Sequence, residues 1–121
     1  MSRYDNLFEA LSGEGAFVPF IMLGDPSPEV ALEIVRAAVA GGADALELGV
    51  PFSDPVADGP TIQASHIRAL ENDATVDAAI EQIKTIRAEF PELPIGMLIY
   101  GNVPFTLDIE NFYQEFHDAG A

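Results

Sequence analysis

The chain has 121 residues, 49% of them hydrophobic, and its 20 acidic residues outnumber 5 basic ones, giving a net charge of −15. This length and composition predict one globular domain with a single core. Nucleic acid is disfavoured as a partner, because the basic residues are scattered and form no stripe that could neutralise phosphates. We interpret the acidity as a solvated surface, with adaptation to salt as the alternative.

Cysteine is absent, which excludes disulfides, thiolate catalysis and the common zinc frameworks. The longest apolar run, residues 16–23, is too short to span a bilayer and is interrupted by Pro19. The first residues lack the charged-then-apolar layout of a signal peptide. We therefore expect a soluble, cytoplasmic protein.

The first part of the chain predicts a helix, a strand and a second helix. Apolar residues at helical spacing over residues 4–11 predict a short amphipathic helix, and residues 16–23 predict a strand. Ser27 followed by Pro28 is typical of a helix start, and the apolar face that follows continues up to Gly41.

The middle of the chain predicts a strand, a loop and two further helices. Residues 45–48 form a short apolar strand, and residues 49–59 form a polar loop rich in proline, glycine and aspartate. A helix is expected over residues 61–70, and Thr75 is expected to cap another whose apolar face extends to Phe90.

The last part predicts a third strand over residues 95–100 and a helix capped by Asp108. Strands that alternate with helices pair in parallel, so the class is α/β, either a doubly wound sheet or a closed barrel. The motif at residues 40–44, just before the second strand, is echoed at residues 118–121. We therefore expect one domain segment, residues 1–121, that stops before a fourth strand, because a complete (β/α)8 barrel takes roughly 250 residues.

Glu47 is the first candidate catalytic residue. Period-2 alternation places Leu46 and Leu48 on one face of the second strand and Glu47 on the other. If the leucines meet the helices, Glu47 faces the barrel interior near the strand end where barrel enzymes keep catalytic side chains. The alternative is a wet edge, or pairing with a basic residue elsewhere.

Asp58 is the second candidate, although taken alone it is typical of a helix cap or an Asx-turn. Together with Glu47 it forms a pair that can occupy different environments, one carrying a proton and one ionised, as acid-base chemistry requires. We interpret His66 and His117 as surface or packing residues, with no role as metal ligand or base.

Three aromatic or apolar side chains near strand ends are candidates for pocket lining. Core packing is the default interpretation of Phe20, Leu98 and Tyr100, and pocket lining is the alternative for Phe20 and Tyr100.

Four segments, residues 17–20, 23–26, 42–63 and 94–102, resemble the tryptophan synthase alpha chain family. The motif ELGVPFSDPVADGPTIQ within the third of them is highly specific, and the resemblance covers the whole chain. It implies the N-terminal part of a (β/α)8 TIM barrel, with a leading helix and about three βα units. It also implies a lyase of tryptophan biosynthesis that splits indole-3-glycerol phosphate into indole and glyceraldehyde 3-phosphate by retro-aldol chemistry.

The resemblance also implies roles for individual residues. Glu47 would be the general acid-base that protonates the indole carbon C3, and Asp58 would accept a hydrogen bond from the indole N–H. Phe20, Leu98 and Tyr100 would line the indole pocket. Met22 stands where the family pattern has threonine, which we expect to alter local hydrogen bonding without abolishing the chemistry.

A partner is implied as well: a tryptophan synthase beta chain, in an assembly of two alpha and two beta chains. Its pyridoxal phosphate would consume the indole, and this chain would hold no cofactor and no metal. The residues that match the family's surface for this partner are Pro51, Asp54, Asn102 and Phe105.

Three interpretations remain open at this point. The first is the N-terminal portion of an alpha chain whose complete form is the lyase, since phosphate-binding loops of such barrels follow strands 7 and 8. The second is a catalytically inactive half barrel that binds a beta chain or another copy of itself through an exposed strand edge. The third, another phosphate-handling barrel, is disfavoured by the motif from Glu47 to Asp58.

Overall fold

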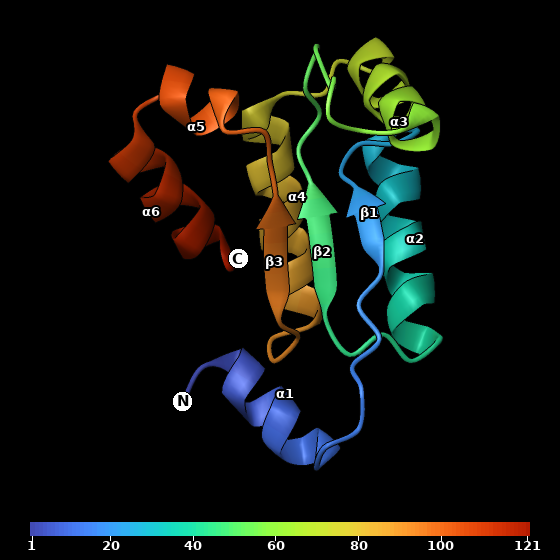
Figure 1. Cartoon of the computed structure of the whole chain (residues 1–121), viewed down its shortest axis with the longest axis vertical. Coiled ribbons are helices and arrows are strands. Elements are labelled where there is room, and N and C mark those ends of the chain that lie inside the picture. Colours follow the sequence, from blue (N-terminus) through green and yellow to red (C-terminus); the bar gives the residue numbers. More distant parts are fainter.

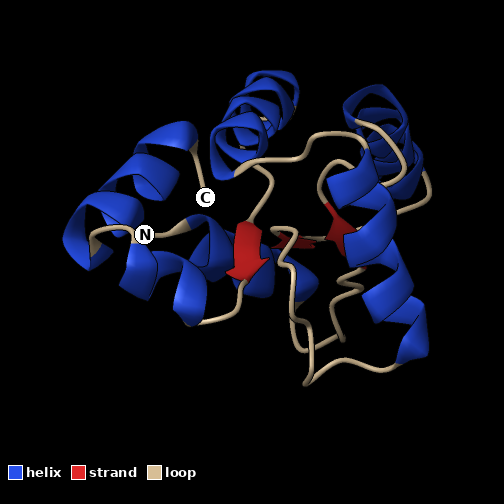
Figure 2. Cartoon of the chain, turned by 90° about the horizontal axis from the view of Figure 1, so that it is seen from above, coloured by secondary structure: helices blue, strands red, loops and turns tan.

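A parallel sheet of three strands forms the centre of the computed structural model, which describes all 121 residues. The strands are β1 (Phe20–Met22), β2 (Leu46–Gly49) and β3 (Ile95–Leu98), in the order β1-β2-β3. The helices are α1 (Arg3–Leu11), α2 (Pro28–Ala40), α3 (Pro60–Glu71), α4 (Val76–Glu89), α5 (Asn102–Thr106) and α6 (Ile109–Ala119). In Figure 1, α1 lies below the strands, while α3 and α5 lie at the end to which the arrows point. Seen from above in Figure 2, the helices stand around the strands in an open arc.

The two faces of the sheet carry different residues. The register pairs Phe20 with Glu47 and Glu47 with Gly96, so these three share one face, which we call the inner face. Leu46 and Leu48 point to the opposite face and are fully buried. The alternation predicted for the second strand is therefore confirmed, and it leaves a carboxylate on the inner face.

The hydrophobic core lies between the outer face of the sheet and helices α2, α4 and α6. Its members include Val35 of α2, Ile83 and Ile86 of α4, and Phe112 and Phe116 of α6. Full burial of one such large apolar side chain contributes about 1.5–3 kcal/mol relative to leaving it exposed. This packing holds the helices against the strands and thereby fixes the loops at the strand ends.

Three of these helices have a side-chain N-cap at the residue that the sequence predicts. Each capping oxygen accepts a hydrogen bond from a backbone N–H in the first turn, which satisfies a donor that has no partner within the helix. The bonds join Ser27 to Val30 at 3.2 Å, Thr75 to Ala78 at 3.1 Å and Asp108 to Asn111 at 2.9 Å.

Two predicted strands are longer than the observed ones, and one helix was not predicted. The expected strand at residues 16–23 is confined to Phe20–Met22, because Pro19 has no N–H to donate to a ladder. The expected strand at residues 95–100 ends at Leu98, so the prediction that Tyr100 lies on a strand is wrong. Tyr100 instead precedes α5, a five-residue helix that is too short to show an apolar period.

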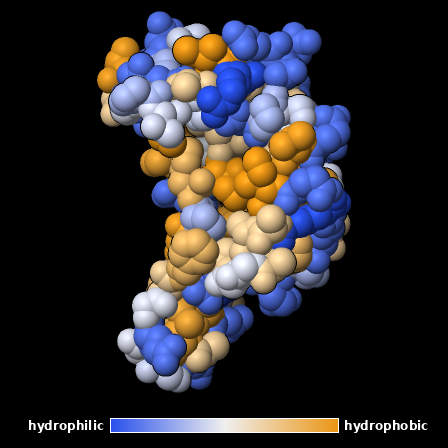
Figure 3. All heavy atoms as spheres, turned by 90° about the vertical axis from the view of Figure 1, so that its right-hand side faces the viewer, coloured by the Kyte–Doolittle hydropathy of each residue, from blue (hydrophilic) through white to orange (hydrophobic).

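The two edge strands, β1 and β3, each have only one neighbouring strand, so each presents an unpaired backbone edge. Figure 3 shows apolar residues gathered over the middle of the molecule, where its outline is hollowed. Among the large apolar side chains exposed to solvent are Phe17, Val18 and Leu98. None of the helices has both the length and the apolar character needed to cross a bilayer.

Candidate functional site

A hollow of about 240 Å³ lies at the C-terminal ends of the strands. It combines apolar walls with a few convergent polar groups, which is the usual character of a small-molecule site. Its lining residues are Phe20, Met22, Ala57, Asp58, His66, Leu98, Ile99 and Tyr100. The structure therefore brings one predicted catalytic residue, Asp58, together with all three predicted pocket residues.

Glu47 lies next to this hollow on the inner face of β2, although it does not line it. It is half-buried, and none of the ion pairs in the structure includes it. Because β2 is the central strand, Glu47 does not lie at a sheet edge. The alternative of a sheet edge is therefore wrong, and no basic residue within residues 1–121 pairs with Glu47.

Tyr4 of α1 reaches the same inner face. Its hydroxyl oxygen stands 2.8 Å from the position that a Cβ on Gly96 would occupy, and Gly96 is the register partner of Glu47. Burial raises the pKa of Tyr4, and the negative charge of Glu47 adds to this shift. A protonated phenol thus covers the inner face beside the carboxylate.

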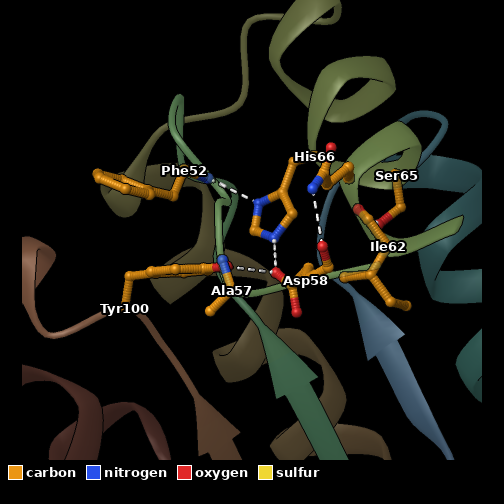
Figure 4. A network of polar contacts seen from close by, with 8 residues as sticks. Phe52, Ala57, Asp58, Ile62, Ser65, His66 and Tyr100 are labelled. Carbon is orange, nitrogen blue, oxygen red and sulfur yellow. Dashed lines mark hydrogen bonds and ion pairs between the residues drawn. The ribbon is translucent and has the colours of Figure 1, made fainter. Parts of the chain in front are cut away.

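Asp58 is held from two sides by side chains of other elements (Figure 4). Its Oδ2 accepts a hydrogen bond from the Tyr100 hydroxyl at 2.8 Å and lies 3.1 Å from Nε2 of His66. The side chain is 25% exposed, and Oδ1 makes no hydrogen bond within the chain. Gly59, not Asp58, caps α3. One carboxylate oxygen is thus occupied, and the other is left to accept a bond from a ligand.

The backbone around Asp58 is fixed by three further hydrogen bonds. The Asp58 carbonyl accepts from Nε2 of Gln63 at 2.7 Å, and its N–H donates to the Pro55 carbonyl at 3.1 Å. The N–H of Ala57 donates to the Tyr100 hydroxyl oxygen at 3.0 Å. These bonds tie the loop between β2 and α3 to the start of the next helix and to the end of β3.

Tyr100 is packed as well as hydrogen-bonded. Its ring stacks on Phe52 with centroids 5.1 Å apart and an interplanar angle of 24°. Loss of solvent around the phenol raises the pKa of Tyr100, and the hydrogen bond to Asp58 adds to the shift. The hydroxyl therefore remains a donor toward Asp58 at neutral pH.

His66 belongs to this site, although no functional role was predicted for it from the sequence. It is only 3% exposed, and its Nδ1 accepts a hydrogen bond from the N–H of Phe52 at 2.9 Å. Of the two positions expected for the histidines, surface or packing, His66 takes the packed one and His117 the exposed one. The helical spacing of Ile62, His66 and Ala69 could have indicated an inward-facing position, because residues four and three apart share one helix face.

The four predicted partner-contact residues lie on two elements at the same end of the sheet. Pro51 and Asp54 belong to the loop after β2, and Asn102 and Phe105 belong to α5 (Figure 1). The Phe105 side chain is 79% exposed. No three His, Cys, Asp or Glu side chains gather in a way that could hold a metal ion.

Comparison with known proteins supplies the family. The tryptophan synthase alpha chain of Corynebacterium aurimucosum is 77% identical across the whole of this chain. A crystal structure of tryptophan synthase subunit alpha from Legionella pneumophila is 36% identical, with a TM-score of 0.95 over 100% of this chain. A tryptophan synthase complex from Pyrococcus furiosus is 37% identical, with a TM-score of 0.83 over 89% of this chain.

The chain spans 45%, 47% and 44% of these three proteins, respectively. Its parallel strands and surrounding helices therefore form part of a (β/α)8 barrel, and the fold class predicted from the sequence is confirmed. A family model for the tryptophan synthase alpha chain matches residues 8–121, and the chain belongs to this family.

Proposed function

We propose that this chain carries the two catalytic carboxylates of a tryptophan synthase alpha subunit, a lyase that cleaves indole-3-glycerol phosphate. The observation that carries the proposal is Asp58, whose free Oδ1 belongs to a carboxylate in the wall of an apolar hollow. Glu47, without any ion-pair partner, stands on the adjoining inner face. Family membership supports the same assignment.

The two carboxylates divide the work of a retro-aldol cleavage. The Glu47 carboxyl group gives a proton to indole C3, and the ring nitrogen becomes positively charged as its electron pair moves into the ring. Asp58 accepts a hydrogen bond from the N–H and stabilises this charge. The Glu47 carboxylate left by this step then takes up the proton of the side-chain hydroxyl, and the bond to C3 breaks. Its electron pair returns to the ring, so indole and glyceraldehyde 3-phosphate leave without any redox change.

The hollow supplies the apolar part of this site. Phe20, Leu98 and Tyr100 line it and would contact the flat faces and edges of the indole ring. Met22 lines it too, and the thioether offers no counterpart for the threonine hydroxyl of the family pattern. Acid-base groups suffice for the cleavage, so we propose that this chain uses no cofactor of its own.

The partner is proposed from the same surface. The loop after β2 and helix α5 lie together at one end of the sheet, and the exposed Phe105 ring offers an apolar contact. A tryptophan synthase complex from Pyrococcus furiosus is among the similar structures, which supports a beta chain as the occupant. Pyridoxal phosphate and the pairing of two alpha with two beta chains would belong to that assembly.

The test uses a joined chain, in which residues 1–121 are followed by the remaining C-terminal part of the Corynebacterium aurimucosum relative. This addition supplies the barrel half in which phosphate is bound in such folds. We expect the joined chain to release indole from indole-3-glycerol phosphate. Glu47→Gln should lower kcat by about 100-fold or more, because amide cannot transfer the proton.

Two outcomes would overturn the proposal. One is a folded joined chain without turnover, which would favour a half barrel that acts only by binding. The other is a Glu47→Gln variant as active as the unmodified joined chain. As a further check, residues 1–121 and the C-terminal part can be produced separately, and turnover is expected only after mixing.

A further inference from the structure

We infer that His66 is the positioning residue of this site: its imidazole holds the Asp58 carboxylate in one orientation that leaves Oδ1 free for the ligand. This inference rests on the proposed function, in which Asp58 receives an N–H group of the substrate. It concerns a residue that touches Asp58 and acts on the reaction only through it.

The hydrogen-bond partners of His66 assign its tautomer. Nδ1 lies 2.9 Å from the backbone nitrogen of Phe52, which can only donate, so Nδ1 must be the acceptor and carries no proton. The single proton of the neutral ring therefore stands on Nε2. Nε2 faces Oδ2 of Asp58 at 3.1 Å, and the contact is an N–H donating to a carboxylate oxygen.

Packing keeps the ring in this orientation. His66 is nearly without solvent contact, and its ring meets that of Tyr100 edge to face, with centroids 5.9 Å apart at 71°. Turning the ring over would place carbon atoms against both the Phe52 N–H and the Asp58 carboxylate, so both hydrogen bonds would be lost. Figure 4 shows the ring between these two partners.

The orientation matters because two donors meet on one oxygen. The Tyr100 hydroxyl, which follows β3, and Nε2 of His66, in α3, both donate to Oδ2. Two donors on the same atom fix the position of the carboxylate and the direction of its plane. Oδ1 thereby keeps its lone pairs for a positive charge that develops on a bound ligand.

Two substitutions of His66 test the roles of its two ring nitrogens independently. His66→Gln keeps a donor near the position of Nε2 and loses the acceptor for Phe52. His66→Asn keeps an acceptor near the position of Nδ1 and cannot reach Asp58. His117→Asn, at an exposed position, is the control.

In the joined chain we expect His66→Asn to lower kcat about tenfold with a smaller change in KM, because the Asp58 contact strengthens as charge develops. His66→Gln should lose clearly less, and the control should match the unmodified chain. Equal losses in both variants, or a smaller loss in His66→Asn, would overturn the positioning role. Absence of turnover in the unmodified joined chain would instead overturn the proposed function.

Nitrogen NMR of the joined chain with isotope-labelled histidine gives a readout that does not depend on turnover. The signals lost in His66→Asn identify the ring. We expect them to show a proton bonded to Nε2 and none on Nδ1, which mere packing would not impose. A proton on Nδ1, or rapid averaging between the two nitrogens, would overturn the inference even if the enzyme is active.

Discussion

The Tyr100 hydroxyl donates a hydrogen bond of 2.8 Å to Oδ2 of Asp58, although the two residues follow different strands of the sheet. The same hydroxyl accepts a hydrogen bond from the N–H of Ala57 at 3.0 Å. One phenol therefore joins the end of β3 to the loop after β2. The arrangement makes the geometry of Asp58 depend on a residue from the next βα unit.

Tyr100→Phe should lower kcat/KM of the joined chain about tenfold, because a hydrogen bond to a charged group is lost while the ring remains. The stacking on Phe52 is retained, so we expect little change in the free energy of unfolding. Tyr113→Phe, at an exposed position, is the matched control. A Tyr100→Phe variant as active as the control would mean that the Asp58 contact does not contribute to turnover.

The pKa of Tyr100 predicts how stability depends on pH. Burial, and then the hydrogen bond to Asp58, raise this pKa above the ordinary value of 10.0, so the folded state holds the phenol proton more tightly than the unfolded state. The resulting stabilisation is complete below the unfolded pKa and is lost as pH rises through the folded pKa. Denaturant unfolding of the joined chain should therefore show a loss of stability in this alkaline range, and the loss should be smaller in Tyr100→Phe, which has no phenol proton at this position.

A spectroscopic titration of Tyr100 tests the cause of the pKa shift. Asp58→Asn removes the negative charge and keeps the burial, so the pKa of Tyr100 should fall while staying above its ordinary value. Difference absorbance between the Asp58→Asn variant and its Tyr100→Phe counterpart isolates this one tyrosine. An unchanged Tyr100 titration in Asp58→Asn would contradict the contribution of the carboxylate.

The features predicted correctly from the sequence are those that neighbouring residues determine. Alternation alone separates Leu46 and Leu48 from Glu47, since successive strand residues point to opposite faces. Likewise, the cap at Ser27 acts on an N–H only three residues away. Asp58 became a candidate because it follows Glu47 on the same strand-loop unit, the family motif gave it a role, and that catalytic role stays a prediction.

The contacts that could not be predicted from the sequence join different elements of the structure. His66 meets Asp58 and Phe52 only after α3 has folded back against the loop that precedes it. No local pattern indicates that Tyr100 donates a hydrogen bond to Asp58, because 42 positions separate them. Helix α5 has five residues, too few for a period of 3.6 to be recognised.

Gly49 keeps room for the aromatic wall of the hollow. A Cβ at this position would stand 2.7 Å from Cζ of Phe20 and 3.1 Å from Sδ of Met22. Gly49→Ala should therefore push the Phe20 ring into the hollow and weaken indole binding about tenfold, measured by calorimetry on the joined chain. The free energy of unfolding should change less, because both neighbours are ends of side chains that can shift.

Gly96→Ala is the control for this prediction, because it adds the same methyl group on the same face of the sheet. Its Cβ would stand 2.8 Å from the Tyr4 hydroxyl, outside the hollow. Indole affinity should therefore change little. Equal losses of affinity in Gly49→Ala and Gly96→Ala would show that the effect comes from the strand backbone and not from the Phe20 ring.

Arg87 joins the end of α4 to the end of α6. Its guanidinium donates to the carbonyls of Gly120 at 3.0 Å, Phe90 at 2.9 Å and Leu93 at 2.6 Å. Burial lowers the pKa of Arg87, with a further contribution from the nearby charge of Arg3, yet a guanidinium stays charged at neutral pH. Arg87→Met should reduce the free energy of unfolding of the joined chain by about 2–3 kcal/mol, because several carbonyls lose a charged donor.

Arg36→Met is the control that distinguishes the loss of the Arg87 hydrogen bonds from the general effect of removing a surface charge. Arg36 pairs with the carboxylates of Glu33 and Glu89 in solvent, where such ion pairs contribute less than about 1 kcal/mol. Urea unfolding should therefore show a clearly larger loss for Arg87→Met than for Arg36→Met. Equal losses would mean that water replaces the guanidinium at the carbonyls, and that the end of α6 is held by the apolar contacts of Phe112 and Phe116.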